Sequence, residues 1–502
     1  MKFARKLSTR LGQYLLLSLS IVLVILVGCS TRESEQRPNI VWIIAEDLSQ
    51  DLGGYGNERV TTPNLDTLAR NGTKFTHVFT AAPICAPSRT ALATGMHQGR
   101  IGAHHMRYPD SLKPALPKNI QTMYTHFQRN GYVTANITDD PGTGKVDWSF
   151  QADEDSQFGY EHWGALTNQE KPFFAQVSIS YTHRSFPELN EAGLDESIGI
   201  PPYYPSHLVS LKDFAKYYES IERLDEEVGR VLQSLKRHGV RKNTIVVFIS
   251  DHGRPMPRGK SFLYDSGIRV PAIIHIPQQL EAPTQYQPGS TNNELLSAID
   301  FSATSLSMAG IEKPESMIEK PESMHGRVFW GENQAPEREY VFSAVDRTGE
   351  SHFKCRAIRS RRYKYIRNYR HDFSINEMAT AYRKANHPIY HLLNILGERN
   401  RLDSAQSSLV EDLPAEELYD LKKDPYEINN LANDPRFEDT KKSLRKELRG
   451  RLQRIDDKGL HTDSRAIVRV FKEYGRSSYS QRKNQIDQLH RRVLNAVEAN
   501  EQ

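Results

Sequence analysis

A cysteine, a serine and an arginine stand close together in the stretch from Pro83 to Gly95, which reads PICAPSRTALATG. Cys85 comes where a turn-rich segment gives way to a run compatible with a short helix. Pro87 fits the first turn of a helix, because the N–H that proline lacks would be unpaired there. The backbone N–H groups at such a helix start can face an anion. A cysteine here can act as a nucleophile, although an unpaired cysteine is more often a small buried apolar residue.

Polar side chains that can bind a ligand follow three apolar runs of the chain. They are Glu46 and Asp47 after Asn39–Ala45, His183 after Phe173–Ser180, and Asp251 and His252 after Thr244–Ser250. Continuous apolar runs of this length are typical of strands that are buried on both faces. Open α/β sheets bind ligands beyond the C-terminal ends of such strands, so we expect these side chains at a ligand site.

Helix signals alternate with these strands. The clearest predicted helix extends from Asp213 to Arg237, where apolar residues recur every three or four positions, and Gly239 ends it. Another is expected to begin after Thr62-Pro63 and to stop at Gly72. Met123–Asn130 favours a helix and Tyr132–Ile137 a strand. This alternation predicts an α/β fold with a large, mostly parallel sheet sandwiched by helices.

The composition changes from about Phe353, where arginines and tyrosines are interleaved as far as Arg370. Alternation over Arg356–Ile366 predicts an antiparallel strand pair, and therefore a smaller α+β C-terminal domain with an antiparallel sheet. A basic, aromatic stretch is also compatible with nucleic-acid binding, but we favour a solvated strand face and expect no nucleic-acid partner. The predicted boundaries are 38–350 for the large domain, 351–475 for the C-terminal one and 476–502 for a helical tail.

Residues 1–28 have the pattern of an export signal. An apolar run from Tyr14 to Val27 follows four cationic side chains, Lys2, Arg5, Lys6 and Arg10. The run is short of the ~20 apolar residues that a membrane-spanning anchor needs. Leu26-Val27-Gly28-Cys29 resembles a bacterial lipoprotein box, so we expect an exported lipoprotein, anchored through a lipid on Cys29 in the periplasm or at the cell surface, with residues 29–37 as a linker. Without residues 1–28 the formal charge of +4 falls to zero, which gives no argument for a polyanionic partner.

Four separated motifs resemble the sulfatase family. In chain order they are Arg37-Pro38-Asn39-Ile40-Val41, the pattern C-x-P-S-R-x-x-L-x-T-G from Cys85, Ser250-Asp251-His252-Gly253, and ELYDLKKDP from Glu417 to Pro425. The resemblance implies the fold of the alkaline phosphatase superfamily. It also implies that a formylglycine-generating enzyme oxidises Cys85 to formylglycine, whose hydrated aldehyde is the nucleophile of the family.

The resemblance further implies one divalent metal. Asp47 and Asp251 match ligands, Glu46 stands where the family usually has aspartate, and His252 takes a place more often held by asparagine. Residue 85 belongs to the same set. We expect calcium, with magnesium as the alternative. Calcium prefers oxygen ligands at ~2.3–2.6 Å, so the nitrogen of His252 puts its direct coordination in question.

Carried over by motif, Arg89 would hold the geometry of the nucleophile, and Lys145 and Lys260 match the two sulfate-binding lysines of the family. His183 matches the histidine that lies near the leaving-group oxygen. One hydroxyl of the hydrated formylglycine would attack sulfur, and His183 would protonate the departing sugar oxygen. The second hydroxyl would then lose its proton and expel sulfate.

Release of sulfate needs a base, and the usual family histidine two residues after Lys145 is replaced here by Asp147. Asp147, His104 and His105 therefore stay open as candidate bases. The residues expected to bind substrate are His104, His105, Asp147, Arg258 and His387. The last of these belongs to an insertion, Asn368–Asp412, which we interpret either as a wall of the sugar subsite or as a helical surface excursion.

The function that follows is hydrolysis of sulfate esters on an external sulfated polysaccharide or oligosaccharide. Gly102–Arg107 and Lys145-Val146-Asp147-Trp148 look most like the branch of the family that includes heparan N-sulfatase-like and marine-polysaccharide sulfatases. We therefore expect an ulvan-type algal polysaccharide as substrate, and a glycosaminoglycan as the second candidate. Two alternatives share these motifs: a phosphodiesterase or phosphonate hydrolase on the same scaffold, and a non-catalytic polysaccharide-binding lipoprotein with an unmodified Cys85.

Overall fold

The computed structural model describes residues 37–186, 198–311, 324–331 and 333–500, and the chain from Pro38 onward forms one compact unit. The expected signal peptide, the lipidation site Cys29 and the linker up to residue 36 lie outside the described residues. Within the described part of the chain, no helix is both long enough and apolar enough to span a membrane.

The central sheet contains eight strands in the described residues. They are β1 (Asn39–Ala45), β2 (Thr73–Phe79), β4 (Val133–Asn136), β5 (Phe173–Ile179), β6 (Thr244–Ser250), β7 (Arg269–His275), β8 (Thr291–Asn292) and β9 (Leu296–Ser297). The order is β4-β5-β1-β6-β7-β2-β8, and β9 also pairs with β2. Strand β1 is parallel to both β5 and β6, whereas β7 is antiparallel to β6 and β2. The predicted mostly parallel sheet is confirmed.

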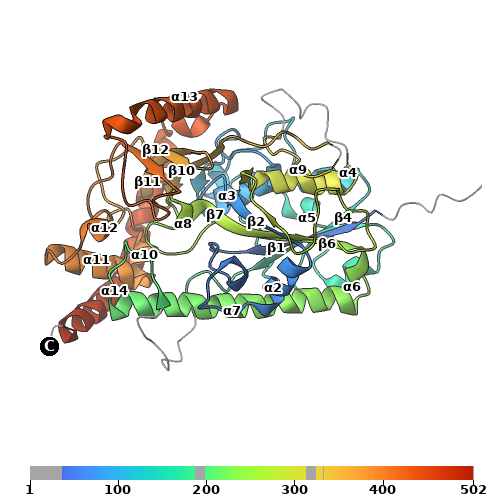
Figure 1. Cartoon of the computed structure of the whole chain (residues 1–502), viewed down its shortest axis with the longest axis horizontal. Helices are drawn as coiled ribbons and strands as arrows, with labels where there is room; N and C mark the ends of the chain where they lie inside the picture. The colour runs from blue at the N-terminus through green and yellow to red at the C-terminus, as the bar shows by residue number, and fades with distance from the viewer. Residues whose placement is uncertain (1–36, 187–197, 312–323, 332, 501–502) are drawn as a thin grey trace, which may run out of the picture. The chain divides into compact units, whose positions relative to one another are not determined.

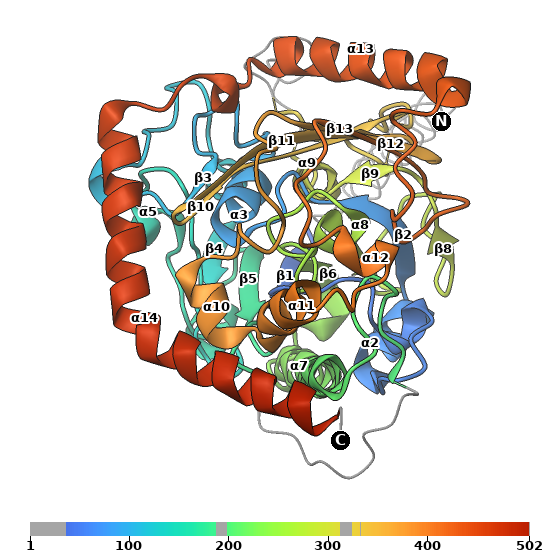
Figure 2. The same ribbon diagram turned by 90° about the vertical axis from the view of Figure 1, so that its left-hand side faces the viewer.

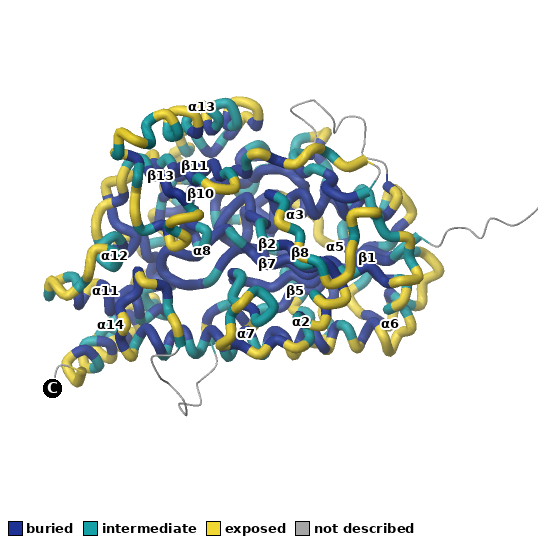
Figure 3. The backbone as a smooth tube through the Cα atoms, viewed as in Figure 1, coloured by how far each residue is buried: buried dark blue, intermediate teal, exposed yellow. Residues whose placement is uncertain are grey.

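Helices cover both faces of this sheet (Figure 1). On one face lie α2 (Pro63–Arg70), α6 (Trp163–Thr167) and α7 (Leu208–Arg237); on the other lie α3 (Cys85–Thr94), α4 (Met123–Arg129) and α9 (Ile299–Met308). Val41 and Ile43 of β1 pack toward the first group, and Ile40 and Trp42 toward the second. Successive side chains of a strand point to opposite faces, so the single apolar run of β1 contributes to both cores. Figure 3 shows this strand as buried.

Helix α7 is longer than predicted. It begins at Leu208 instead of Asp213, because His207 caps its first turn: the imidazole Nδ1 accepts a hydrogen bond of 3.1 Å from the backbone N–H of Val209. Imidazole is not among the usual N-cap groups, which is why the sequence pattern missed this start.

A second sheet contains five strands in the described residues, in the order β13-β12-β11-β10-β3. They are β3 (His105–Met106), β10 (Val341–Thr348), β11 (Ser351–Arg359), β12 (Tyr363–Asn368) and β13 (Glu416–Asp420). The strands from β10 to β13 are antiparallel, and β3 joins β10 in parallel. The predicted antiparallel pair is β11 and β12, but the sheet begins at Val341, ahead of the boundary expected at 351. One face packs on the main core and the other lies under α13 (Glu438–Ile455) (Figure 2).

Helix α5 (Glu154–Gln157) lies beside α4, where Gln157 accepts hydrogen bonds from Thr122 and Thr125. The other α-helices lie near the second sheet and one end of the main domain. They are α8 (Asp265–Ile268), α10 (Ala381–Asn386), α11 (Pro388–Glu398), α12 (Ser404–Ser407) and α14 (Arg465–Ala499). Helix α14 runs unbroken across the boundary expected between 475 and 476, and it packs against α11 through Leu489, Val493 and Val497. The insertion Asn368–Asp412 contains α10, α11 and α12, and α11 contacts both α7 and α14.

Candidate functional site

Cys85 is the first residue of α3 and is fully buried. The preceding residue, Ile84, is extended, so the chain turns into the helix at the cysteine. The Cys85 Sγ atom lies 3.2 Å from Nε2 of His252 and 3.9 Å from Oδ1 of Asp47. Because β1 and β6 are parallel neighbours, the residues that follow them meet at one edge of the sheet, and α3 brings the cysteine to the same place.

Asp47, Cys85, Asp251 and His252 form a buried group in which one ligand atom from each lies within 4.8 Å of the others. Asp47 adopts a positive φ of 54°, a strained conformation for a non-glycine residue. Its backbone N–H donates a 3.0 Å hydrogen bond to Asp251 Oδ1. Burial opposes a charged imidazole, yet the carboxylates of Asp251 and Asp47 raise the pKa of His252 to about 10. Carboxylates gathered in this way also suit a divalent cation.

Glu46 belongs to a second possible metal-binding group, with Asp47 and His183. Its Oε1 atom is buried and accepts no hydrogen bond from the described residues, and Nη2 of Arg89 lies 3.9 Å from it. An orphaned carboxylate oxygen beside other acids is a suitable ligand for a divalent cation. The residues expected as metal ligands therefore come together in two groups that share Asp47. Their three carboxylates suit a hard divalent cation such as calcium or magnesium.

Arg89 fixes the position of Asp251. Its Nε donates to Asp251 Oδ2 at 3.0 Å and its Nη1 to the Ser178 hydroxyl at 2.9 Å, while Nη2 is buried without a hydrogen-bond partner in the described residues. Burial disfavours its charge, but the carboxylates of Asp251 and Glu46 outweigh this and raise the pKa of Arg89. A permanently charged guanidinium therefore stands beside the acids, with one nitrogen available to an anion.

Lys260 completes the buried charge network. Its Nζ donates to both carboxylate oxygens of Asp47, at 2.8 and 2.9 Å. Burial acts against its charge, but Asp47 raises the pKa of Lys260 above its ordinary value. The positive charge of Lys260 in turn lowers the pKa of His183.

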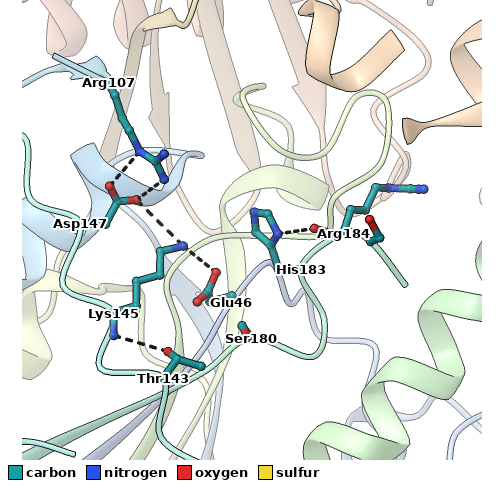
Figure 4. Close-up of a pocket in the computed structure, with 9 residues that line it drawn as sticks. Glu46, Arg107, Thr143, Lys145, Asp147, Ser180, His183 and Arg184 are labelled. Carbon is teal, nitrogen blue, oxygen red and sulfur yellow. Dashed lines mark hydrogen bonds and ion pairs between the residues drawn. The ribbon is translucent and has the colours of Figure 1, made fainter. Parts of the chain in front are cut away.

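A cavity of about 630 Å³ opens beside these groups (Figure 4). It is lined by Glu46, Arg107, Thr143, Lys145, Asp147, Ser180, His183, Arg184 and Ser185. Lys145 Nζ donates to Glu46 Oε2 at 2.6 Å and lies 4.0 Å from Asp147 Oδ2. Arg107 donates to both oxygens of Asp147, at 3.1 and 3.4 Å. The cavity lining thus combines cationic side chains that are held by ion pairs with side chains that can exchange protons. Cys85 is not one of the lining residues.

His183 is oriented by the chain that follows it. Its Nδ1 donates to the carbonyl of Arg184 at 2.6 Å, which leaves Nε2 as the nitrogen that can exchange a proton. Arg184 is itself held by Asp213, with two hydrogen bonds of 2.6 and 2.8 Å. The insertion reaches this point as well, because the Tyr382 hydroxyl donates to the Arg184 carbonyl at 3.0 Å.

His104 and His105, two of the expected substrate-binding residues, do not line this cavity in the described structure. Both are buried, and their rings lie 4.2 Å apart between centroids. His105 Nε2 lies 3.1 Å from Oδ1 of Asp463, a residue just before α14. These contacts hold β3 against the start of α14.

Arg258 and His387 are also buried away from the cavity wall. The Arg258 guanidinium lies 3.6 Å from the ring centroid of Tyr264, and it donates to the carbonyl of Glu427. His387 packs beside Tyr382 and Tyr390. Of the five residues expected to bind substrate, the structure brings Asp147 alone to the cavity among the described residues.

The cavity also contains residues to which the sequence analysis gave no role: Arg107, Thr143, Ser180, Arg184 and Ser185. For most of these residues, the position in the sequence next to an expected site residue could have indicated a place in the cavity. Ser180, Arg184 and Ser185 flank His183 beyond the end of β5, and Thr143 belongs to the turn before Lys145. Arg107 ends the loop that carries the two adjacent histidines.

Comparison with known proteins agrees with this geometry. The family model described as Sulfatase matches residues 38–311, and the model described as N-sulphoglucosamine sulphohydrolase, C-terminal, matches residues 258–404. An ulvan-active sulfatase from Formosa agariphila is 34% identical over 489 residues, which cover 87% of this chain and 78% of that protein. Human N-sulphoglucosamine sulphohydrolase is 26% identical over 467 residues, covering 82% of this chain and 89% of the human protein.

Among solved structures, the 2-O GAG sulfatase BT1596 has the same fold, with a TM-score of 0.57 at 20% identity over 86% of this chain and 96% of its own. The Sulfatase match contains β1, the Cys85 segment, β6 and Lys260, which are the parts of the chain that build the buried charge network. This chain therefore belongs to the sulfatase family and is a sulfuric ester hydrolase.

Proposed function

We propose that this protein removes sulfate esters from an ulvan-type algal polysaccharide, with a glycosaminoglycan as the second candidate substrate. The similarity to the ulvan-active sulfatase of Formosa agariphila supports the choice of polymer. One observation carries the proposal at the level of the site. Lys145 projects from the cavity wall and, through its hydrogen bond to Glu46, lies next to the acids that surround Cys85 (Figure 4).

Residue 85, once oxidised to formylglycine and hydrated, would supply a hydroxyl as nucleophile. A divalent cation, which we propose to be calcium, would offset the charge of the sulfate when held by Glu46, Asp47, Asp251 and His252. Arg89 keeps the acids in place, because it is anchored to Asp251 and to Ser178 at once.

Lys145 and Lys260 would bind the oxygens of the sulfate group. Their side chains keep 20% and 11% of their surface exposed, although each forms a close ion pair with a buried acid. Ammonium groups fixed in this way need no rearrangement when the charge on sulfate oxygens shifts during the reaction, which is the basis of electrostatic stabilisation.

His183 would protonate the departing sugar oxygen from Nε2. In the free protein the charge of Lys260 lowers the pKa of His183 and disfavours the imidazolium. A bound sulfate ester adds negative charge beside the ring and favours the protonated form at the moment when it is needed.

Asp147 is the base that we propose for the release of sulfate. Of the three candidates left open by the sequence, it alone lines the cavity in the described structure, whereas His104 and His105 are directed to Asp463 and to each other. Burial opposes ionisation of Asp147, but Arg107 outweighs it and lowers the pKa of the carboxyl, so the carboxylate is the form present at neutral pH.

We also propose that the protein is exported and anchored through a lipid on Cys29, and that a formylglycine-generating enzyme converts Cys85. The lipoprotein-box pattern and the Cys85 motif support these proposals. A periplasmic or surface location would give the enzyme access to an external polymer.

The test is sulfate release from defined ulvan oligosaccharides by protein produced with a formylglycine-generating enzyme. We expect turnover by the wild type, an aldehyde on residue 85 in its peptide mass spectrum, and no turnover by Cys85→Ala with an unchanged circular dichroism spectrum. Preference for phosphate diesters or phosphonates would contradict the proposal and favour the related hydrolases. An unmodified Cys85 without turnover of any ester would favour a binding lipoprotein.

A further inference from the structure

A second pocket, of about 340 Å³, is lined by residues of the second sheet and of α13 and shares none of them with the active-site cavity. Figure 2 shows α13 lying along the strands of this sheet. Tyr365, Arg367 and Tyr369 contribute to it from β12 and the residue that follows this strand. Residues two positions apart share one face of a strand. The basic, aromatic stretch of the sequence therefore presents one Tyr-Arg-Tyr row to this pocket and is not simply a solvated strand face.

Helix α13 closes the pocket from the other side. Leu448 and Leu452 are buried and form its apolar floor, and Arg445 and Arg449 stand beside them at helical spacing. The leucines pack on the sheet with the rest of the local core, so the two arginines are held on a fixed surface.

The charges of the pocket are unbalanced. Glu416 of β13 accepts a hydrogen bond of 2.7 Å from Arg445 Nη2 and lies 3.7 Å from Arg367 Nη1. It also accepts from the Tyr365 hydroxyl. Three guanidinium groups thus face one carboxylate, the only acid among the described residues that line the pocket.

Two of these guanidinium groups have N–H donors that are not paired with an acceptor in the described residues. The Nε atom of Arg445 is buried without a hydrogen-bond partner, and Arg449 is exposed and forms no ion pair, both within the described part of the chain. The exposed guanidinium of Arg449 lines the pocket, so its N–H donors can reach an anionic ligand there. Guanidinium groups match the oxygens of a sulfate or phosphate group with paired hydrogen bonds.

An aromatic surface lies beside these donors. The Tyr369 side chain is 40% exposed, and the Arg367 guanidinium lies 5.8 Å from its ring centroid. An exposed flat ring next to cations can pack against the apolar C–H face of a sugar while the arginines bind its charged substituent.

We infer that this pocket is a second binding site for the sulfated polysaccharide, occupied by a sulfated sugar unit of a chain that is being desulfated elsewhere on the enzyme. The inference rests on the proposed function for the identity of the polymer. We favour a saccharide over a nucleic acid, because Tyr369 is the only exposed tyrosine among the described residues that line the pocket, and a single ring gives no platform for successive stacked bases. Attachment at a second point raises the local concentration of sulfate esters near the active site.

The kinetic test compares a sulfated polymer with a short fragment that carries one sulfate. We combine Arg449→Glu with Tyr369→Ala, because both residues are exposed and neither belongs to the active-site cavity. We expect KM for the polymer to rise by at least about tenfold, the effect of losing one charged hydrogen bond, while kcat and the kinetics on the fragment stay unchanged. Lys446→Glu is the matched control, since it makes the same charge change on an exposed residue of α13 outside the pocket.

Binding is measured separately by affinity electrophoresis in gels that contain ulvan, desulfated ulvan or single-stranded DNA. This measurement needs no turnover, so it tests the pocket even if no sulfate release is observed. We expect ulvan alone to retard the wild type, and the double variant to lose most of that retardation. Unchanged retardation and unchanged polymer KM in the double variant would overturn the inference. Stronger retardation by DNA that the variant loses would also overturn it, in favour of a nucleic-acid site. Arg449→Ala replaces the double variant if the latter unfolds at a lower temperature.

Discussion

Lys145 Nζ lies 2.6 Å from Oε2 of Glu46, and this hydrogen bond joins the open cavity to the buried acids around Cys85. Because Lys145 lines the cavity and is hydrogen-bonded to Glu46, a ligand that contacts it is linked to the charged residues at the edge of the sheet. Its partner Glu46 is also the acid with the orphaned oxygen, and both side chains line the cavity, so the pair would bring the proposed sulfate site next to the proposed cation site.

Replacement of Lys145 by alanine removes a fixed positive charge from the sulfate site. We expect kcat/KM for sulfate esters to fall about 100-fold, the usual effect of losing one preorganised donor. Lys145→Arg keeps the charge and should lose less. The exposed Lys118, which does not line the cavity, gives the control variant Lys118→Ala. Steady-state kinetics on one oligosaccharide would measure all three, and an unchanged kcat/KM in Lys145→Ala would contradict the role.

His183→Gln tests protonation of the leaving group. A sugar alkoxide needs a proton in order to leave, whereas 4-nitrophenolate leaves well without one. We expect turnover of a sugar sulfate to fall about 10²- to 10⁴-fold and turnover of 4-nitrophenyl sulfate to fall far less. Glutamine keeps a hydrogen-bonding side chain of similar length at the cavity wall. Equal losses on both substrates would assign His183 to binding and not to proton transfer.

Glu46→Gln tests the metal site through its unsatisfied oxygen. The neutral amide keeps the size of the side chain but is a weaker ligand for a hard cation. We expect a chelator to remove activity from the wild type and calcium to restore it, with a higher calcium concentration needed for the variant. Calcium should also raise the unfolding temperature of the chelated wild type, because a ligand that binds only the folded state stabilises it. Equal calcium requirements would exclude Glu46 as a ligand.

The positions of the charged residues around the metal site were predictable, because they depend on the neighbouring sequence alone. Two buried strands are directly followed by these residues, Glu46, Asp47, Asp251 and His252, and neighbouring parallel strands end at the same edge of a sheet. The helix that begins at Cys85 is equally local. The alternation of strands and helices gave the main sheet in the same way, since each element carries its own period of apolar residues.

Some residues that were expected to bind substrate do not line the cavity, because their contacts are with partners far away in the chain. His105 was expected at the cavity, but Asp463, 358 residues later, draws its ring toward the start of α14. Arg258 donates to a carbonyl 169 residues later, at Glu427. The neighbouring residues in the sequence do not indicate such partners. A histidine or arginine that binds substrate therefore cannot be told from one that contacts a distant group. The short strand β3 was missed for the same reason, because its pairing with β10 exists only in the folded chain.

Asp463→Asn tests one of these distant contacts through the pH dependence of stability. Asp463 lies 2.6 Å from Arg347 Nε and 3.1 Å from His105 Nε2. Burial opposes its charge, but His105 and Arg347 outweigh this and lower the pKa of Asp463 below that of the unfolded chain. The carboxylate therefore stabilises the fold above pH ~4, and this contribution is lost as the pH falls further.

At pH 7 we expect Asp463→Asn to lower the free energy of unfolding by about 2 kcal/mol, because the charge of Arg347 loses its partner. Asp456→Asn is the control, since Asp456 is exposed and its ion pair with Arg100 should contribute less than about 1 kcal/mol. Denaturant titrations at pH 7 and pH ~3 measure both differences. The difference between wild type and Asp463→Asn should narrow at the lower pH, because Asp463 takes up a proton in the unfolded chain while the folded protein still holds it as a carboxylate, which lowers the free energy of unfolding of the wild type. A difference that stays constant or widens in acid would show that Asp463 acts through packing and not through its charge.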